Sequence, residues 1–371
     1  MKKFWIILVL GILVRVFLSY TTFHPDLAAI SESGRVVAAG NILNLYDFSS
    51  DRVVFNYPPA IYWFFGLTSL LFGGALWLLK LPYLIFDLLL AVLLYRLVDP
   101  KKAIWAFGIW MFNPVNLYAT YMMGQFDIIP TFFSVLSIYL AFKGKLNWAA
   151  VALGVGIAFK LYPVFLVVPL ILLGKGVGAK IKLLILAALP YLISILPYIP
   201  SGSFRSVALF ANQSSKSLYA SIPVSGGESI LLFPAFLLLF YLLLWGLKFQ
   251  ADLWRLFLIP LALFFIFTHF HPQWLIWITP FLILDLVKGQ FKNKVAVLIV
   301  LGSWVGSLFF FDPSLTLGLF APIFPALKNT ADIWTLLGLN IDFNSSRSIL
   351  QTILAAAMSY FIISQFHKKD A

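Results

Sequence analysis

The sequence contains no cysteine, and only 11% of its 371 residues are charged. Without cysteine the chain can form no disulfide, offer no thiolate nucleophile and supply no cysteine ligand to zinc. With 62% apolar residues and a mean hydropathy of +0.97, it has too little polar surface to coat a soluble globule of this length. These two deficits predict a polytopic integral membrane protein.

Acidic residues are also scarce, with 14 Asp and Glu against 26 Lys and Arg and a formal net charge of +12. A basic excess can indicate nucleic-acid binding, but here the basic residues are dispersed over short segments between apolar runs. This dispersal is typical of the positive-inside pattern of membrane proteins. We therefore expect membrane lipid as a partner and no nucleic acid.

Apolar runs recur from Phe4 to Phe366, and many approach the 20 or so residues that a helix needs to cross a bilayer core of roughly 30 Å. We predict an all-α protein with about twelve transmembrane helices in a single membrane domain covering residues 1–371. The predicted crossings are Phe4–Tyr20, Leu76–Leu97, Ala103–Tyr118, Ile128–Phe142, Asn147–Phe159, Pro163–Leu173, Ile181–Tyr198, Ile230–Leu247, Leu253–Phe270, Trp274–Val287, Val295–Phe311 and Ile349–Phe366.

Lysines at both ends of the chain set the predicted orientation. Lys2 and Lys3 place the N-terminus in the cytoplasm, and Lys368 and Lys369 place the C-terminus there too. The run Ala60–Phe72 is about 20 Å long at 1.5 Å per residue, which is short for a crossing, so we expect it to lie in the outer interface. We predict an integral membrane location, the plasma membrane in a prokaryote. The predicted extracytoplasmic loops are 21–74, 199–229 and 312–347.

Polar motifs gather on the predicted outer face. They are His24-Pro-Asp26, Tyr57-Pro-Pro-Ala-Ile-Tyr-Trp63, Gly124-Gln-Phe-Asp127, Lys160-Leu-Tyr-Pro163 and His271-Pro-Gln-Trp274. With the N-terminal crossing and the long outer loop that opens on an acidic residue, these motifs resemble the GT-C superfamily of membrane glycosyltransferases. Their spacing is most similar to glycosyltransferase family 87 and related mannosyltransferases.

The resemblance implies an inverting transfer of a hexose, with mannose favoured, from a polyprenyl-phosphate or dolichyl-phosphate carrier. The acceptor would be a hydroxyl of a glycan, lipid or protein, and the active site would be extracytoplasmic. By its match to the early acidic position of the family, Asp26 is the expected catalytic base, with Glu32 as the alternate. The alternative is that Asp26 caps a helix over Leu27–Ala39.

Three outer cations are candidates for binding the donor phosphate: Arg205, Lys160 and Lys216. Arg205 is favoured because its planar guanidinium can bind phosphate oxygens through two hydrogen bonds, whereas a lysine acts as a point charge. The alternative for these cations, and above all for Lys216, is anchoring at anionic lipids.

The expected sugar- or acceptor-binding residues are His24, Gln125, Asp127, His269, His271, Gln273 and Trp274. Two of them have simpler alternatives, since Asp127 could cap the helix that follows it and Trp274 could anchor at the interface. The H-x-H pair His269 and His271 has no third ligand nearby, so we expect no metal and no other cofactor.

The geometric hypothesis is that five outer-face residues share one pocket open to lipid: His24, Asp127, Lys160, Arg205 and His271. Inside the bilayer, Arg15 and Asp87 are expensive unless they face the helix bundle or a partner, so a structural role is expected. Two other functional classes stay open. A secondary transporter or lipid-linked sugar flippase would place ionisable residues near the midplane, and a scaffold subunit of an envelope-assembly complex would leave the outer-face cluster unexplained.

Overall fold

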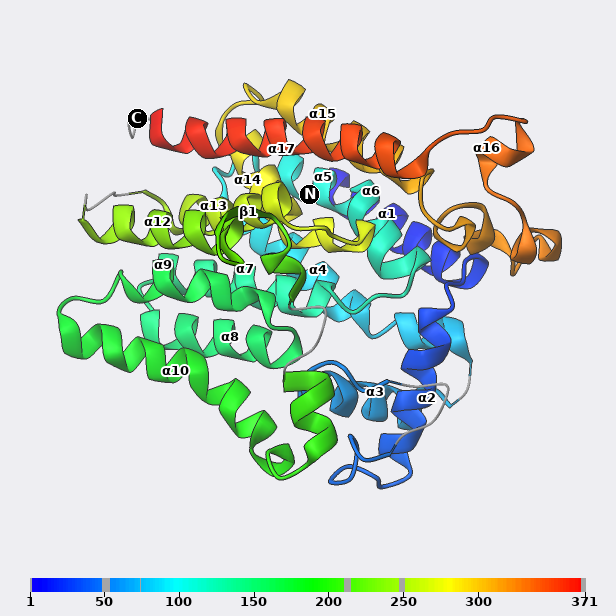
Figure 1. The fold of residues 1–371 in the computed structure, drawn as a ribbon, viewed down its shortest axis with the longest axis horizontal. Coiled ribbons are helices and arrows are strands. Elements are labelled where there is room, and N and C mark those ends of the chain that lie inside the picture. Colours follow the sequence, from blue (N-terminus) through cyan, green and yellow to red (C-terminus); the bar gives the residue numbers. More distant parts are fainter. Residues whose placement is uncertain (1, 49–53, 74, 210–214, 247–250, 368–371) are drawn as a thin grey trace. The chain divides into compact units, whose positions relative to one another are not determined.

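The computed structural model describes residues 2–48, 54–73, 75–209, 215–246 and 251–367. It is mostly helical (Figure 1), which confirms the helical class. Contacts divide the chain into two compact units, which we describe separately. Unit 1 comprises Met1–His24, Leu94–Met123 and Lys216–Ala371, and unit 2 comprises Pro25–Leu93 and Gly124–Ser215. The single membrane domain stays a prediction.

Among the described residues, four helices are long and apolar enough to cross a membrane, which supports an integral membrane protein. They are Lys2–Thr21, Leu76–Leu97, Val177–Tyr198 and Phe343–Phe366. Other predicted crossings form shorter helices, and a helix of 15 residues such as Ile128–Phe142 extends about 22 Å at 1.5 Å per residue. The prediction of about twelve crossings is therefore not confirmed.

Unit 2 contains a layer of three helices, α7, α8 and α10, that pack in that order (Figure 1). A Cβ at Gly154 of α8 would come within 2.3 Å of the Ala187 carbonyl oxygen of α10, so glycine permits this approach. The elements of unit 2 are α2 (Asp26–Ala38), α3 (Pro59–Phe72), η1 (Leu76–Lys80), α4 (Tyr83–Leu97, whose last turn belongs to unit 1), α7 (Ile128–Phe142), α8 (Leu146–Phe159), η3 (Tyr162–Leu166), α9 (Val167–Ile171), α10 (Val177–Ile195), η4 (Leu196–Tyr198) and η5 (Phe204–Leu209).

Helices α2 and α3 of the first predicted outer loop interlock through two glycines. A Cβ at Gly34 would lie 2.6 Å from the Phe65 carbonyl oxygen, and one at Gly66 would lie 2.4 Å from Val37 Cγ1. Real Cβ atoms cannot approach so closely, because packed interiors leave no room for extra atoms. The α2 backbone therefore meets the α3 backbone at Gly34, and Gly66 of α3 packs against the Val37 side chain in the second half of α2. The placement of α3 in the outer interface stays a prediction.

Unit 1 is built around α17, which packs against α13 and α15. Figure 1 shows α15 and α17 side by side. The elements of unit 1 are α1 (Lys2–Thr21), α5 (Ala103–Met111), α6 (Pro114–Asn116), η2 (Leu117–Met122), η6 (Lys216–Leu218), β1 (Ser221–Ser225), β2 (Glu228–Leu231), α12 (Leu232–Gly246), α13 (Leu253–Phe267), η7 (Pro272–Trp277), α14 (Thr279–Lys288), α15 (Lys294–Leu308), η8 (Pro313–Leu315), η9 (Leu317–Phe320), η10 (Pro325–Asn329), α16 (Ile333–Leu336) and α17 (Phe343–His367).

The predicted crossing Ala103–Tyr118 is interrupted after Met111. Asn113 adopts an extended backbone, and its side chain accepts hydrogen bonds from the backbone N–H groups of Val115 and Asn116. Pro114 has no N–H to continue the first helix, yet it fits the first position of a new one. A new helix therefore begins at Pro114, and it continues into the π-helical segment η2.

The last part of the predicted outer loop 199–229 forms most of a β-hairpin, which the all-helical prediction missed. Strands β1 and β2 are antiparallel, with Ile222 opposite Ile230. Gly226 and Gly227 form the turn with φ angles of 56° and 90°, which glycine adopts at low cost. Two glycines between short apolar stretches are a recognisable hairpin signal, so the sequence did carry this information.

Arg15 and Asp87 are fully buried, as expected for ionisable residues in predicted crossings. In unit 1, Arg15 Nη1 donates hydrogen bonds to the carbonyl oxygens of Gly11 at 3.0 Å and Met111 at 2.7 Å, and its guanidinium lies 5.5 Å from the centre of the Tyr121 ring. Arg15 therefore ties α1 to the end of α5, which is a structural role.

Candidate functional site

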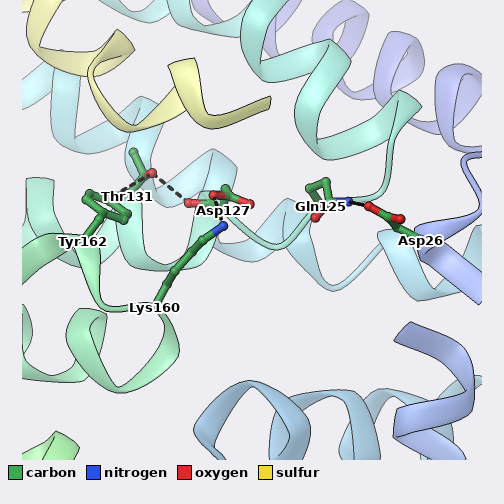
Figure 2. Close-up of polar contacts among 6 residues, drawn as sticks. All are labelled: Asp26, Gln125, Asp127, Thr131, Lys160 and Tyr162. Atoms are coloured by element: carbon green, nitrogen blue, oxygen red, sulfur yellow. Dashed lines mark hydrogen bonds and ion pairs between the residues drawn. The ribbon is translucent and has the colours of Figure 1, made fainter. Parts of the chain in front are cut away.

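The centre of the candidate site in unit 2 is an ion pair between Asp127 and Lys160 (Figure 2). Lys160 Nζ lies 2.7 Å from Asp127 Oδ1, and the two side chains are 9% and 0% exposed. Asp127 directly precedes α7, but its side chain makes no capping hydrogen bond, so the alternative of a helix cap is not what the structure contains. Lys160 directly follows α8 in an extended conformation, with φ of −159° and ψ of 140°.

Two aromatic rings also lie beside the Lys160 ammonium. Lys160 Nζ lies 5.5 Å from the centre of the Tyr57 ring and 5.0 Å from that of Phe126, which are cation–π distances. Burial lowers the pKa of Lys160, and the Asp127 carboxylate acts in the opposite direction. Since the ammonium is held by partners from its own unit, its observed role is to fasten the end of α8 to the start of α7.

Thr131 and Tyr162 extend this polar cluster one turn into α7. Thr131 Oγ1 donates to the Asp127 backbone oxygen at 2.7 Å and lies 3.0 Å from the Tyr162 hydroxyl oxygen (Figure 2). Both residues are buried. The sequence prediction missed both, although Tyr162 belongs to the quoted Lys160-Leu-Tyr-Pro163 motif and Thr131 lies four residues after Asp127, one helical turn along the same face.

Asp26 and Gln125 form a second polar contact in unit 2. Gln125 Nε2 donates to Asp26 Oδ2 at 2.7 Å (Figure 2). Asp26 is the exposed first residue of α2, and the N-cap position that the alternative interpretation gave to Asp26 is occupied by Pro25. The preceding Gly124 has a φ of +74°, the left-handed conformation that glycine tolerates, and turns the chain toward Gln125.

Lys80 is the charged residue of unit 2 that sequence reasoning missed. It is fully buried, and its Cε would lie 3.3 Å from a Cβ placed on Gly124. Its position inside the apolar run Leu76–Leu97 made it look like part of a crossing. A buried lysine in such a run is costly unless its amine has polar partners. A lysine within an apolar run is therefore a sequence signal of an internal polar site.

The alternate base Glu32 forms an ion pair within its own helix. Its carboxylate is 3.6 Å from Arg35 Nη1, in a largely exposed pair one turn along α2. Both residues line a cavity of about 500 Å³ at the start of α2. An exposed pair of this kind adds little to stability.

The Arg205 side chain forms hydrogen bonds to the backbone of the turn that follows η4. Its Nη1 donates to the carbonyl oxygens of Ile199 at 2.7 Å and Pro200 at 2.9 Å. These are carbonyl groups that a helix end leaves without helical partners. The guanidinium therefore stabilises a local turn, and phosphate binding by Arg205 stays a prediction.

In unit 1 the structure brings together Lys216, His269, His271 and Trp274. Lys216 Nζ lies 2.8 Å from His271 Nε2 and 5.5 Å from the centre of the Trp274 ring. The His271 ring centre is 5.1 Å from that of Trp274 and 6.0 Å from that of His269. Burial lowers the pKa of Lys216. Burial and the nearby cations Lys216 and Arg347 lower the pKa of His269.

The remaining predicted residues of unit 1 are both buried. His24 lies near Asp312, whose pKa is lowered by hydrogen bonds from Ser314 and also by His24. Gln273 is 8% exposed, and its Oε1 has no hydrogen-bond partner in the part of the chain that the structure describes. Within those same residues, no group of three or more His, Asp or Glu is arranged to hold a metal ion.

The five residues of the shared-pocket hypothesis fall in different units. His24 and His271 belong to unit 1, and Asp127, Lys160 and Arg205 belong to unit 2. Within unit 2 the structure pairs Asp127 with Lys160, while Arg205 binds its own turn. The shared pocket and the ligand-binding roles stay predictions.

Residues 18–258 match the family model described as GPI transamidase subunit PIG-U. The matched segment covers well over half of the chain, and it includes the four polar residues Asp26, Gln125, Asp127 and Lys160.

This match corrects the functional expectation drawn from the sequence. It assigns the chain to a family of transamidase subunits, so the assignment to glycosyltransferase family 87 and the transfer of a sugar from a polyprenyl-phosphate donor are wrong. The motifs that supported the resemblance are short and lie at helix ends, where polar residues collect in membrane proteins of many functions. They could not distinguish an enzyme from a subunit.

Proposed function

Because the chain belongs to the PIG-U family, we propose that it is a membrane-embedded subunit of a multi-protein assembly of the transamidase type. In this role it binds partner proteins within the membrane and holds them in register. The match over residues 18–258 is the observation that carries the proposal.

The internal chemistry of unit 2 supports a scaffolding role. Lys160 contacts Asp127, Tyr57 and Phe126, so its charge stabilises the packing of the end of α8 against the start of α7. Buried ion pairs are costly to desolvate, and their best-attested use is to fix one arrangement of helices among several. A subunit that other proteins dock against needs such a fixed arrangement.

The composition supports the same division of labour. Transamidation replaces one amine by another at a carbonyl carbon, and a cysteine thiolate is a common nucleophile for acyl transfer. This sequence contains no cysteine. If the assembly uses a thiolate, a different chain supplies it, and the present chain contributes binding and position.

We propose the following membrane arrangement. Both termini are cytoplasmic, the loops 21–74, 199–229 and 312–347 are extracytoplasmic, and the shorter apolar helices also cross, giving about twelve crossings. The dispersed lysines support this orientation. The membrane would be the plasma membrane in a prokaryote, and the subunit would work without a cofactor.

The test is purification of the assembly. The chain would carry an N-terminal affinity tag, be cross-linked in native membranes, solubilised in a mild detergent and analysed by mass spectrometry. We expect a reproducible set of partner proteins in fixed stoichiometry. Recovery of the chain alone after cross-linking would overturn the proposal.

A pair of variants sharpens this test. Asp127→Asn removes one charge of the buried pair, whereas Asp99→Asn removes a charge from an exposed residue that accepts a hydrogen bond from the backbone of Lys101. We expect Asp127→Asn to lower the recovery of partners and Asp99→Asn to leave it unchanged. Equal recovery in both variants would show that the buried pair does not support assembly.

A further inference from the structure

Unit 1 contains a pocket of about 430 Å³ at one end of its three packed helices. Its walls come from the end of α13 and the residues after it, from the last turns of α15, and from the first turns of α17. The volume falls in the range of ligand pockets, which is roughly 300–1,000 Å³. All the lining residues lie between 266 and 354, beyond the segment that matches the family.

The helices that form this pocket are fastened to each other. Gln351 Nε2 of α17 donates to the Phe265 carbonyl oxygen of α13 at 2.7 Å. A Cβ at Gly306 of α15 would lie 3.2 Å from Leu350 Cδ2 of α17, so these helices also approach closely. These two contacts hold α17 against α13 and α15 without a ligand, so the walls of the pocket are formed in advance, which lowers the cost of binding.

The pocket is lined by one permanent cation, Arg347, and by the titratable imidazole of His269. Among the described residues that line it, none is Asp or Glu. Arg347 Nη2 donates a hydrogen bond to Asn344 Oδ1 at 2.6 Å, and the Arg347 guanidinium lies 5.0 Å from the centre of the Phe311 ring. A guanidinium has five N–H donors, so donors remain for a ligand.

A buried hydroxyl provides the second independent observation. Thr268 lines the pocket and is 2% exposed, and its Oγ1 has no hydrogen-bond partner among the residues that the structure describes. Thr268 Oγ1 has almost no solvent-accessible area, so a ligand oxygen meets it only after the Thr268 side chain rotates toward the pocket, and the new hydrogen bond would then offset the cost of an unpaired buried hydroxyl. Phe267, Leu350 and Leu354 add an apolar wall beside it.

The start of α17 does not itself supply the binding groups. Asp342 Oδ1 already accepts hydrogen bonds from the backbone N–H groups of Asn344 and Ser345. An anion in the pocket would therefore be held by side chains, chiefly Arg347 and Thr268. A bare phosphate would leave most of the volume to water, whose share of liquid volume is about 30 Å³ per molecule.

We propose that this pocket binds a phosphate ester, with Arg347 and the Thr268 hydroxyl contacting the phosphate oxygens and the apolar wall contacting the esterified group. The ester is either part of a membrane-lipid headgroup or part of a small soluble molecule. Because α17 is long and apolar enough to cross a membrane and the pocket lies at its first turns, a lipid headgroup would reach the pocket from the interface.

Binding to the purified full-length chain in a neutral detergent tests the proposal. The probes are dihexanoyl phosphatidylglycerol, dihexanoylglycerol, which lacks the phosphate, glycerol 3-phosphate and inorganic phosphate. We expect phosphatidylglycerol to bind and dihexanoylglycerol not to bind. Binding of glycerol 3-phosphate as tight as that of phosphatidylglycerol would identify a soluble ester as the ligand, and tighter binding of phosphatidylglycerol would identify a lipid.

Matched variants connect the binding to this pocket. Arg347→Gln should weaken phosphatidylglycerol binding by roughly tenfold or more, since a charge-assisted hydrogen bond is worth about 1.5–3 kcal/mol. The control Lys328→Gln removes the same charge from an exposed residue outside the pocket. Thr268→Val removes the buried hydroxyl, with Thr352→Val on the exposed side of α17 as its control.

The outcomes are distinct. Weaker binding in both pocket variants, with both controls unchanged and all proteins eluting as the parent does, supports the proposal. If Arg347→Gln misfolds, Arg347→Lys keeps the charge and should retain partial binding. Equal binding of phosphatidylglycerol and dihexanoylglycerol, or full binding by both pocket variants, would overturn it. Co-purification of partner proteins is a separate readout, so a failure here leaves the proposed assembly role intact.

Discussion

Lys160 Nζ and Asp127 Oδ1 lie 2.7 Å apart, and neither side chain is more than 9% exposed. The charges come from residues 33 positions apart in the chain, at the end of α8 and just before α7. A pair that is so well buried stabilises the fold only while both partners are present, because either charge alone would stay desolvated without compensation. The coupling energy between the two charges can therefore be measured with single and double variants.

Removing both partners should cost less than the two single removals added together. Lys160→Met and Asp127→Asn are each expected to lower the free energy of unfolding by roughly 3–5 kcal/mol, and the double variant by less than the sum. Denaturant titration of the four proteins in detergent measures the coupling. Additive effects would show that the two charges do not interact.

An exposed ion pair provides the control for that cycle. Lys288 Nζ lies 3.4 Å from Asp252 Oδ2 in unit 1, with side chains 32% and 57% exposed. Because water screens such pairs, Lys288→Met should change the free energy of unfolding by no more than about 1 kcal/mol.

The contact between α2 and α3 should not tolerate a methyl group. Gly34→Ala would place Cβ 2.6 Å from the Phe65 carbonyl oxygen, so the helices must separate, at a cost of roughly 1–3 kcal/mol. Gly302→Ala is the matched control, since it lies within α15 with nothing within 4 Å of its Cβ position. Thermal unfolding compares them, and equal midpoints would contradict the interlocked arrangement.

The absence of cysteine makes the proposed orientation directly testable. A single cysteine can be placed at exposed Ser225 of β1 or at exposed Lys143 between α7 and α8, with no native thiol to remove. In intact cells a membrane-impermeant maleimide should label Ser225→Cys and should label Lys143→Cys only after lysis. The reverse pattern would invert the proposed topology.

Binding in the unit 1 pocket should strengthen as the pH falls through the pKa of His269. Burial, Lys216 and Arg347 hold that pKa below the usual 6.5, so the imidazole is neutral near pH 7 and becomes cationic only at lower pH. The other neighbouring ring, His271, lies 6.0 Å away. A bound anion favours the protonated form.

The measurement is the Kd of dihexanoyl phosphatidylglycerol between pH 5 and 8, a range in which this diester keeps its charge. We expect the Kd to fall toward pH 5 in the parent protein, and His269→Gln to flatten the profile. A parent profile that is already flat would remove His269 from the pocket's electrostatics.

Local patterns predicted the helices well and their interruptions poorly. The prediction Ile128–Phe142 matches α7 residue for residue, because its apolar run is bounded by Asp127 and by Lys143-Gly144. The break at Asn113-Pro114 was missed although both residues are turn and capping types, since the apolar run around them was read as one crossing. The hairpin was missed for a different reason, because its Gly226-Gly227 turn was assigned to an outer loop without secondary structure.

The candidate site was predicted as a list of residues and not as an arrangement. Asp127 and Lys160 were both named, yet their contact with each other was not, and buried Lys80 was overlooked within an apolar run. Arg205 was chosen for its planar donors, and the structure shows that one nitrogen, Nη1, donates to two backbone carbonyl groups. A side chain's chemistry limits what it can bind, but its neighbours decide what it does bind.

The sequence by itself determined that this protein is helical and belongs in a membrane, because the length and polarity of each run are local properties that water and lipid act on directly. Only the tertiary structure decided which charged side chains form ion pairs and which form hydrogen bonds to backbone carbonyl groups. Residues such as Lys160 and Asp127 are separated along the chain, so their contact depends on how the helices between them turn and pack.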